Sequence, residues 1–301
     1  MPLQHLYLNN NGLGPFAGTF IADALSELHA KKVEARKQGQ EVPDLETVIC
    51  GRNRLENGSM EAWAKTFKLH NKIKQIKMVQ NGIRQEGISH LLSEGLRHTS
   101  ELQILDLQDN TFTLKGAKAL AKVAPGWTEI LELGIGDSLL GSKGSVLLAE
   151  SLSKGKNKKL EILRLQYNEI TAPGVKGLAE AAKTGLPALK KIELNGNKFT
   201  EDDQSIILLQ ELFEERKEKL GGDVVIEDEW GVDSLSDLED IDSDEEEEED
   251  EEEDEEEEEE EVKEKAEKFI KDAETAQQEP VAQVKDKEID DLAKQFEKTA
   301  I

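Results

Sequence analysis

One short pattern, repeated at a nearly constant interval, constrains the fold of this chain more than any other feature. It is clearest at residues 160–170, which read LEILRLQYNEI. The alternating Leu163 and Leu165 predict a short strand with both side chains on one face. Leu160 and Ile170 are expected to close the core at the two ends of the bend. Asn168 is expected to satisfy backbone groups that the turn leaves unpaired.

The same register occurs seven times, which identifies the pattern as the leucine-rich-repeat signature. We call the asparagine position of each repeat the ladder position. Its residues are Asn11, Asn53, Asn81, Asn110, Ser138, Asn168 and Asn197. Successive positions lie 42, 28, 29, 28, 30 and 29 residues apart, which leaves room for an α-helix after each strand. We therefore expect an α/β leucine-rich-repeat solenoid. It would be a ribonuclease-inhibitor-like horseshoe with a parallel sheet on its concave side and helices outside.

Charge divides the chain into three parts. The net charge is −27, but residues 227–261 hold 26 acidic and no basic residues, which leaves the rest nearly neutral. An acidic run of this kind repels itself and cannot bury a core. We expect a leucine-rich-repeat domain over residues 1–230 and a disordered acidic segment over 231–261. A mixed-charge, weakly helical tail is expected over 262–301.

Helices are expected between the strands. The segments with helical apolar spacing are residues 58–69, 85–97, 114–123, 142–153 and 172–183. A longer helix is expected over residues 201–219, and together with residues 224–226 it is expected to cap the C-terminal end. In the first helix, residues 15–36, Phe16 and Phe20 belong to the apolar set at helical spacing. That helix and a polar loop to Pro43 are interpreted as a solvated insertion that explains the interval of 42.

The chain begins inside a repeat, because Leu3 already holds the first leucine position. A solenoid needs a polar cap at each end, since every repeat buries its apolar side only against its neighbours. We therefore expect an N-terminally truncated version of a longer solenoid, or an incomplete gene model.

No motif of enzyme chemistry is visible. The five histidines pair with neither cysteine nor carboxylate at metal-ligand spacing, and no phosphate-binding glycine loop occurs. The single cysteine, Cys50, holds a core strand position, which suits a reducing compartment. No apolar run reaches the length of a membrane span, and the neutral repeats give no argument for nucleic acid. A binding scaffold without its own active site, cofactor or metal is predicted.

The residue before each ladder position should lie on one rim of the solenoid, at the C-terminal end of a strand. These residues are Asn10, Arg52, Gln80, Asp109, Asp137, Tyr167 and Gly196. Neighbouring strands lie about 4.8 Å apart, so Asn10 to Asp109 would span roughly 15 Å, within one protein–protein footprint. The alternative is that turn positions are exposed, and therefore polar, in any solenoid.

Several blocks resemble the Ran GTPase-activating proteins, particularly the fungal form. They are residues 5–15 (HLYLNNNGLGP), 49–60 (ICGRNRLENGSM), 77–84 (KMVQNGIR), 105–113 (LDLQDNTFT) and 163–170 (LRLQYNEI). With the acidic segment, the resemblance covers about residues 2–260. It implies a cytoplasmic activator, acting also at the nuclear periphery, of GTP hydrolysis by Ran in nucleocytoplasmic transport. The implied partner is a Ran-type small GTPase in its GTP state, and a Ran-binding protein is a second candidate partner.

The resemblance also implies roles for individual residues. In that family the activator inserts no arginine finger. An asparagine of the block matching residues 5–15 lies beside the nucleotide and helps to order the GTPase's own glutamine, which orients the attacking water. By alignment this is Asn10, while Arg52, Arg54 and Asp109 match polar positions near the partner. The family's further repeats, with a functionally important arginine, precede this block and have no counterpart here.

A second class of protein also pairs a solenoid with an acidic tail. The acidic leucine-rich nuclear phosphoproteins bind histones through such tails and have no GTPase role. Their repeats are shorter, with irregular or 3₁₀ segments on the convex side. The intervals of 28–30 residues and the amphipathic helices here favour the GTPase activator.

Overall fold

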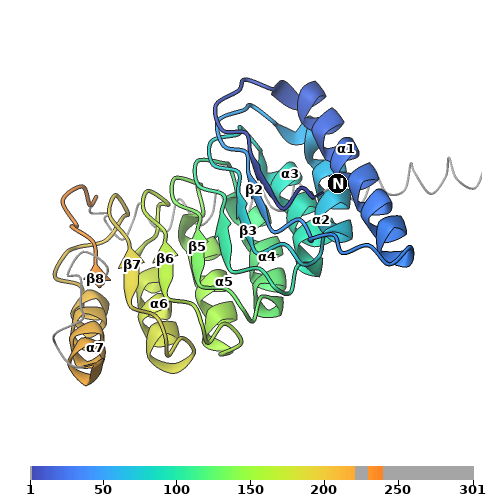
Figure 1. Ribbon diagram of the computed structural model, residues 1–301. Coiled ribbons are helices and arrows are strands. Elements are labelled where there is room, and N and C mark those ends of the chain that lie inside the picture. The colour runs from blue at the N-terminus through green and yellow to red at the C-terminus, as the bar shows by residue number, and fades with distance from the viewer. Residues whose placement is uncertain (1, 221–229, 240–301) are drawn as a thin grey trace, which may run out of the picture. The chain divides into compact units, whose positions relative to one another are not determined.

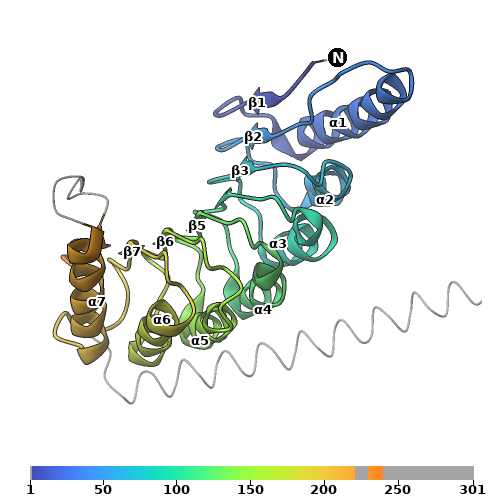
Figure 2. The same cartoon turned by 60° about the horizontal axis from the view of Figure 1, so that its bottom comes forward.

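The strands form one parallel sheet. The computed structural model describes residues 2–220 and 230–239. Each strand pairs with its neighbours in the chain, in the order β1 to β8. The strands line the inner side of an arc and the helices its outer side (Figures 1 and 2). The predicted fold class, a leucine-rich-repeat solenoid with a parallel concave sheet and outer helices, is confirmed.

Strands and helices alternate throughout. The strands are β1 (His5–Tyr7), β2 (Thr47–Ile49), β3 (Gln75–Lys77), β4 (Ile104–Asp106), β5 (Glu132–Gly134), β6 (Ile162–Arg164), β7 (Lys191–Glu193) and β8 (Gly231–Val232). The α-helices are α1 (Gly14–Lys37), α2 (Met60–Leu69), α3 (Gln85–His90), α4 (Thr113–Val123), α5 (Gly141–Ser153), α6 (Ala172–Thr184) and α7 (Gln204–Leu220). Short helical turns are η1 (Asn57–Ser59), the π-helical η2 (Leu91–Gly95), η3 (Leu96–His98) and η4 (Ala124–Gly126).

The signature leucines fill the space between the sheet and the helices. The middle residues of successive strands stack in register, as in the pairing of Val48 with Ile76. Leu163 and Leu165, the alternating pair that predicts a strand, are both fully buried. In the first repeat Leu3, Leu6, Leu8 and Leu13 are only partly buried against the same core.

The ladder asparagines satisfy backbone groups inside the turn, as predicted. Asn168 is fully buried. Its Oδ1 accepts the backbone N–H groups of Ser138 at 3.1 Å and Leu140 at 3.2 Å. Its Nδ2 donates to the carbonyls of Ile135 at 2.8 Å and Leu165 at 3.1 Å. One side chain therefore joins two consecutive repeats.

The packing face of α1 differs from the expected one. Phe16 and Phe20 are 76% and 61% exposed, and their rings contact each other edge to face at 4.7 Å. The buried residues of α1 are Gly18, Ala22, Leu25, Leu28 and Lys32. A Cβ on Gly18 would lie 2.6 Å from Leu55 Cδ2, so the close approach of the helix to the next repeat depends on the missing side chain at Gly18. The phenylalanines are turned outward as a result.

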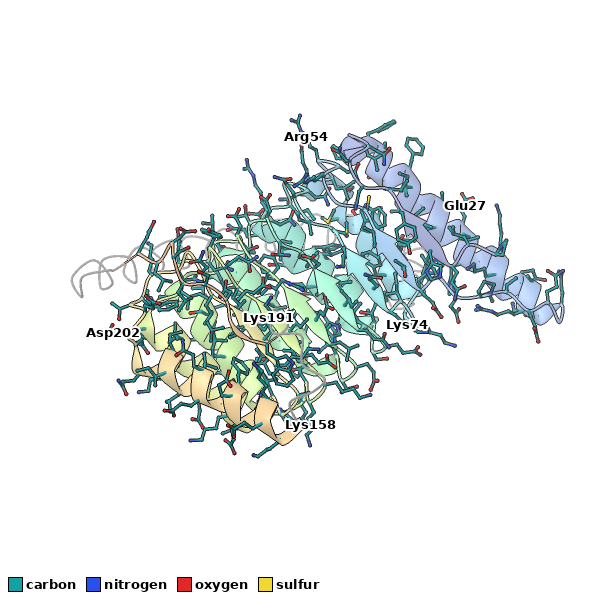
Figure 3. The ribbon with its side chains drawn as sticks, turned by 60° about the vertical axis from the view of Figure 1, so that its left-hand side comes forward. Glu27, Arg54, Lys74, Lys158, Lys191 and Asp202 are labelled. Atoms are coloured by element: carbon teal, nitrogen blue, oxygen red, sulfur yellow. The ribbon has the colours of Figure 1, made fainter. Side chains whose placement is uncertain are left out.

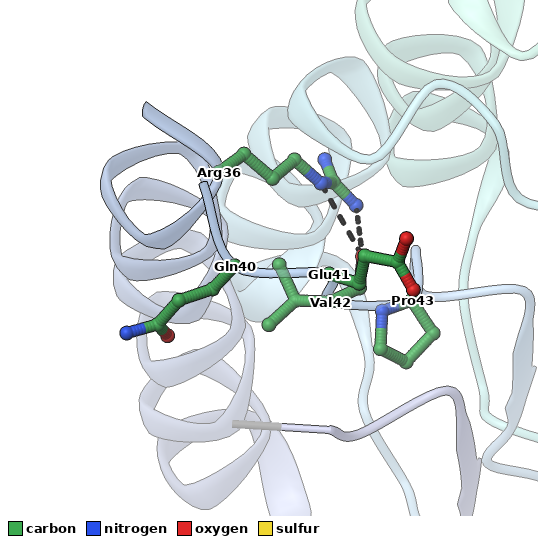
Figure 4. Close-up of a pocket in the computed structure, with 5 residues that line it drawn as sticks. All are labelled: Arg36, Gln40, Glu41, Val42 and Pro43. Carbon is green, nitrogen blue, oxygen red and sulfur yellow. Dashed lines mark hydrogen bonds between the residues drawn. The ribbon is translucent and has the colours of Figure 1, made fainter. Parts of the chain in front are cut away.

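The insertion after α1 is tied to the repeats rather than simply solvated. Lys32 is 1% exposed, and its Nζ donates to the carbonyls of Leu3 and Pro43. Arg36 donates to the Val42 carbonyl at 2.9 Å and to the Asp44 carboxylate at 2.6 Å. These contacts fold residues 38–44 back along the helix, around the hollow in Figure 4.

The helix expected at residues 85–97 is broken into α3, η2 and η3. A Cβ on Gly95 would lie 2.7 Å from Ala64 Cα, because this segment closely approaches the backbone of α2. Packing between repeats thus overrides the local helical pattern.

The repeat domain continues past the predicted boundary at residue 230. The two-residue strand β8 pairs in parallel with β7. Asp233 then accepts the backbone N–H groups of Leu194 at 2.7 Å and Asn195 at 3.2 Å. The expectation that disorder begins at residue 231 is therefore wrong for residues 231–239. The predicted cap residues 224–226, the acidic segment from residue 240 and the tail lie outside the described residues.

Candidate functional site

The residues that precede the ladder positions all adopt the left-handed backbone conformation. We call this set the rim row. Its φ values are 59° at Asn10, 56° at Arg52, 54° at Gln80, 55° at Asp109, 51° at Asp137, 55° at Tyr167 and 70° at Gly196. The shared conformation turns the chain at the end of each strand. The side chains of the row therefore stand at equivalent positions of successive repeats.

Backbone hydrogen bonds fix the rim row from one repeat to the next. Each of its first six members donates its N–H to a carbonyl of the following repeat, over distances of 2.7 to 3.0 Å. Asn10, for example, donates to Gly51 at 2.9 Å, and Arg52 donates to Val79 at 2.8 Å. Hydrogen bonds thus hold the backbone of the rim row in place, and its side chains project from this backbone.

Some members of the row are held at a conformational cost. Glycine, asparagine and aspartate tolerate left-handed φ values, whereas other residues do so less readily. Arg52, Gln80 and Tyr167 occupy this region nonetheless, and so does Arg54 with φ 54°. Arg54 projects outward from the molecule in Figure 3. Glycine would meet the conformational need of this turn, so the turn itself does not require these side chains.

Asn10 and Asn11 are adjacent but differ in their contacts. The side chain of Asn11 donates to the carbonyls of Leu8 at 2.8 Å and Asn9 at 3.0 Å. The side-chain amide of Asn10 is exposed and has no hydrogen-bond partner within residues 2–220 and 230–239. Its oxygen and its NH₂ group are therefore both available to a molecule that docks on the rim.

The other predicted site residues belong to the rim row or, in the case of Arg54, lie close to it in the sequence. Arg52 and Arg54 are exposed, one on each side of the buried ladder residue Asn53. Burial is the main cause that raises the pKa of Asp109, and the carboxylate of Asp137 raises it further. Arg52 and a hydrogen bond from Gln80 act in the opposite direction on that pKa. The rim therefore changes from positive at the second repeat to negative at the fourth and fifth.

Two features of the rim lie outside the sequence-based set of site residues. Leu139 is 46% exposed and has φ 52°, although the repeat pattern places it in an ordinary turn. Asp237 accepts hydrogen bonds from the Tyr167 hydroxyl at 2.8 Å and from Asn195 Nδ2 at 3.0 Å. No signal in the sequence connects Asp237 with Tyr167, because 70 residues separate them.

Within the described ranges, no group of three or more histidine, cysteine, aspartate or glutamate side chains could hold a metal ion. No helix in that part of the chain is both long and apolar enough to cross a bilayer.

Comparison with known proteins shows that the chain is similar to two groups of proteins. The model of a leucine-rich-repeat family matches residues 100–121 and 156–179. Ran GTPase-activating protein 1 of Saccharomyces cerevisiae is 43% identical over 217 residues, which are 71% of this chain and 52% of that protein. The Ran GTPase-activating protein of Drosophila melanogaster is 30% identical over 206 residues, 68% of this chain and 33% of that protein. The ribonuclease inhibitor of Mus musculus is 24% identical over 213 residues, 70% and 43% of the two chains. The match to this chain thus spans about half of the yeast relative and a third of the fly relative.

Proposed function

We propose that this chain, a leucine-rich-repeat relative of the Ran GTPase-activating proteins, binds a Ran-type GTPase in its GTP state and accelerates GTP hydrolysis. The observation that carries the proposal is Asn10, an exposed amide with free donor and acceptor groups on a fixed backbone. The names of the yeast and fly relatives support the reaction and the partner. They also favour this function over histone binding by an acidic leucine-rich phosphoprotein.

Asn10 would act by positioning. GTPases of this class hold the attacking water with a glutamine of their own. An amide can accept a hydrogen bond from the glutamine NH₂ group and donate one to its oxygen at the same time. The backbone bond from Asn10 to Gly51, at 2.9 Å, fixes the Cα from which the amide extends. The chain would therefore lower the entropic cost of ordering the partner's catalytic group without adding a charge to the transition state.

Arg52, Arg54 and Asp109 would hold the partner. The two arginines are exposed, with no ion pair to a carboxylate among the described residues. Both arginines would meet acidic groups of the GTPase. Asp109 would meet a basic group, which would also return the raised pKa of this carboxyl toward its ordinary range. The chain would work in the cytoplasm, including the nuclear periphery, as part of nucleocytoplasmic transport, and a Ran-binding protein would be a second partner.

Single-turnover hydrolysis tests the proposal. GTP-loaded Ran is mixed with the chain, with its Asn10→Ala variant, or with neither, and phosphate release is followed. The matched control is Asn71→Ala. Asn71 is an exposed asparagine that precedes strand β3, so it lies toward the N-terminal end of that strand, whereas the rim row follows the C-terminal ends. We expect acceleration by the chain and by Asn71→Ala. Asn10→Ala should bind Ran but lose most of the acceleration, about a hundredfold or more.

Arginine variants separate binding from catalysis. If Arg52 and Arg54 act in binding, Arg52→Ala and Arg54→Ala raise KM and leave kcat nearly unchanged. A loss of kcat at unchanged KM in either variant would instead indicate an arginine finger, and the assignment of Asn10 would be wrong. No acceleration by the unmodified chain would reject the proposed function for this chain.

A further inference from the structure

Leu139 is an exposed apolar residue of the rim to which the proposed function gives no role. It follows the ladder residue Ser138, is 46% exposed and has φ 52°. A bulky side chain in this conformation is an outlier, because its Cβ crowds the following carbonyl. The equivalent residues of the first and third repeats are Gly12 and Gly82, which have φ values of 60° and 64°. The turn thus accepts glycine and does not need the leucine.

The core does not need the side chain of Leu139 either. Its chain neighbours Ser138 and Leu140 are 1% and 0% exposed, so they supply the packing of this turn. Leu139 follows Asp137 of the rim row by two residues, and Tyr167, the rim-row residue of the next repeat, is 47% exposed. We call these three residues the Leu139 patch.

The Leu139 patch is continuous with the proposed binding residues. Asp137 is close enough to Asp109 to raise the pKa of its carboxyl. The hydrogen bond that the Tyr167 hydroxyl donates to Asp237 is the main cause that raises the pKa of this hydroxyl, and Asp137 raises it further. The backbone N–H of Asp109 donates to the Gly136 carbonyl at 2.9 Å, and that of Asp137 donates to the Gln166 carbonyl at 2.7 Å. The hydrogen bonds of the rim row therefore continue through this part of the rim. A partner that covers Asn10 to Asp109 therefore reaches the patch by extending over the next repeats.

We propose that the Leu139 patch is the second half of the GTPase-binding surface. Its partner is a patch on the same GTPase that presents an apolar side chain surrounded by basic groups. The proposal rests on the proposed function. Leu139 and, in the next repeat, Tyr167 expose large apolar groups of the kind that the centres of stable interfaces bury. The carboxylate of Asp137 selects the basic surroundings.

The charges along the rim fix the direction in which the partner lies. Arg52 and Arg54 stand at the second repeat, whereas Asp109 and Asp137 stand at the fourth and fifth. A partner turned end for end would place like charges together at both ends, which disfavours the wrong orientation. The apolar centre then adds affinity only in the orientation that also brings Asn10 to the nucleotide.

Binding and stability measurements on the same variants test this inference. The dissociation constant of GTP-loaded Ran is measured for the unmodified chain, Leu139→Gly, Leu139→Ala and the control Leu208→Ala. Leu208 is 54% exposed on α7, so the control also truncates an exposed leucine. We expect both Leu139 variants to bind about tenfold more weakly, as loss of a largely buried leucine contact predicts. Leu208→Ala should bind as tightly as the unmodified chain.

Leu139→Gly has a second readout that a structural role would not give. Glycine relieves the left-handed backbone, so its melting temperature should equal or exceed that of the unmodified chain while its binding weakens. Asp137→Asn should slow association at low ionic strength, and this difference should shrink as salt is added.

The outcomes separate the two proposals. Unchanged affinity of both Leu139 variants, in a chain that accelerates hydrolysis, overturns the role of the patch and leaves the proposed function standing. Weaker binding that comes with a lower melting temperature in Leu139→Gly also overturns it, because the leucine would then be structural. An unmodified chain that neither binds Ran nor accelerates hydrolysis overturns both.

Discussion

Replacing Asn168 by alanine should destabilise the solenoid far more than a surface substitution does. Asn168 has no exposed surface, and four of its hydrogen bonds join backbone groups of two repeats. The alanine variant loses all four bonds, and of the four backbone groups only the Leu165 carbonyl keeps another side-chain partner, Asn197 Nδ2 at 3.0 Å. At about 1 kcal/mol net for each lost bond, the free energy of unfolding should fall by about 4 kcal/mol.

The fifth repeat provides a matched comparison. Its ladder residue is Ser138, whose Oγ donates only to the Gly136 carbonyl, at 3.0 Å. Ser138→Ala therefore removes one bond and should cost about 1 kcal/mol. The two variants truncate the same ladder position in adjacent repeats, so the difference between them measures the bonds that the amide adds.

Urea unfolding followed by circular dichroism measures both values, with m taken from the slope of each transition. The melting temperature of Asn168→Ala should fall by about 8–16 °C, at about 2–4 °C per kcal/mol for a domain of this size. Similar losses of about 1 kcal/mol in the two variants would refute the view that the ladder amide holds the repeats together. A changed m in one variant would instead indicate that the repeats no longer unfold as one unit.

Two further predictions concern buried titratable groups. Burial is the main cause that lowers the pKa of His70 from its ordinary 6.5, and the pKa of His29, whose ring lies 5.0 Å away, is lowered too. Between the lowered pKa values of the folded chain and about 6.5, the unfolded chain binds more protons than the folded chain, so stability should decline as pH falls through this interval. Melting temperatures at about pH 7.5 and 5.5 should show a smaller decline in His70→Gln than in the unmodified chain, and an equal decline would contradict the assignment. Burial also raises the pKa of the Cys50 thiol to about 11. A thiol reagent should therefore label Cys50 only in urea, and rapid labelling of the folded chain would show that the thiol is accessible.

The repeat pattern predicts the sheet and the core because each signature residue has one job in every repeat. Leu163 and Leu165 are buried in a strand for the same reason as their equivalents, and one consensus suffices for all. The outer helices are less predictable. The exposure of Phe16 and Phe20 follows from the close contact of Gly18 with Leu55, which links repeats 42 residues apart at their ladder positions. The pattern within one helix cannot show such a contact.

The rim could be predicted in position but not in backbone conformation or in its contacts with distant residues. Counting back from the ladder asparagines finds the rim row, and the sequence distinguishes charged from neutral members. The left-handed φ of Arg52 or Leu139 is invisible to that count, because leucine and arginine give no sign of it. The bond between Tyr167 and Asp237 joins a consensus repeat to an acidic stretch outside the consensus. Nothing in either segment indicates the other.

The first two repeats show how the sheet tolerates variation in the chain. Their ladder positions are 42 residues apart, against 28 to 30 for the others. Strand β1 nevertheless pairs with β2 in the same register, and the rim bond from Asn10 to Gly51 has the ordinary length of 2.9 Å. The spacing of the strands is therefore set by their hydrogen bonds and does not depend on the length of chain that connects them. Insertions on the convex side can accumulate in evolution, or be engineered as attachment points, without changing the spacing of the groups that a partner meets.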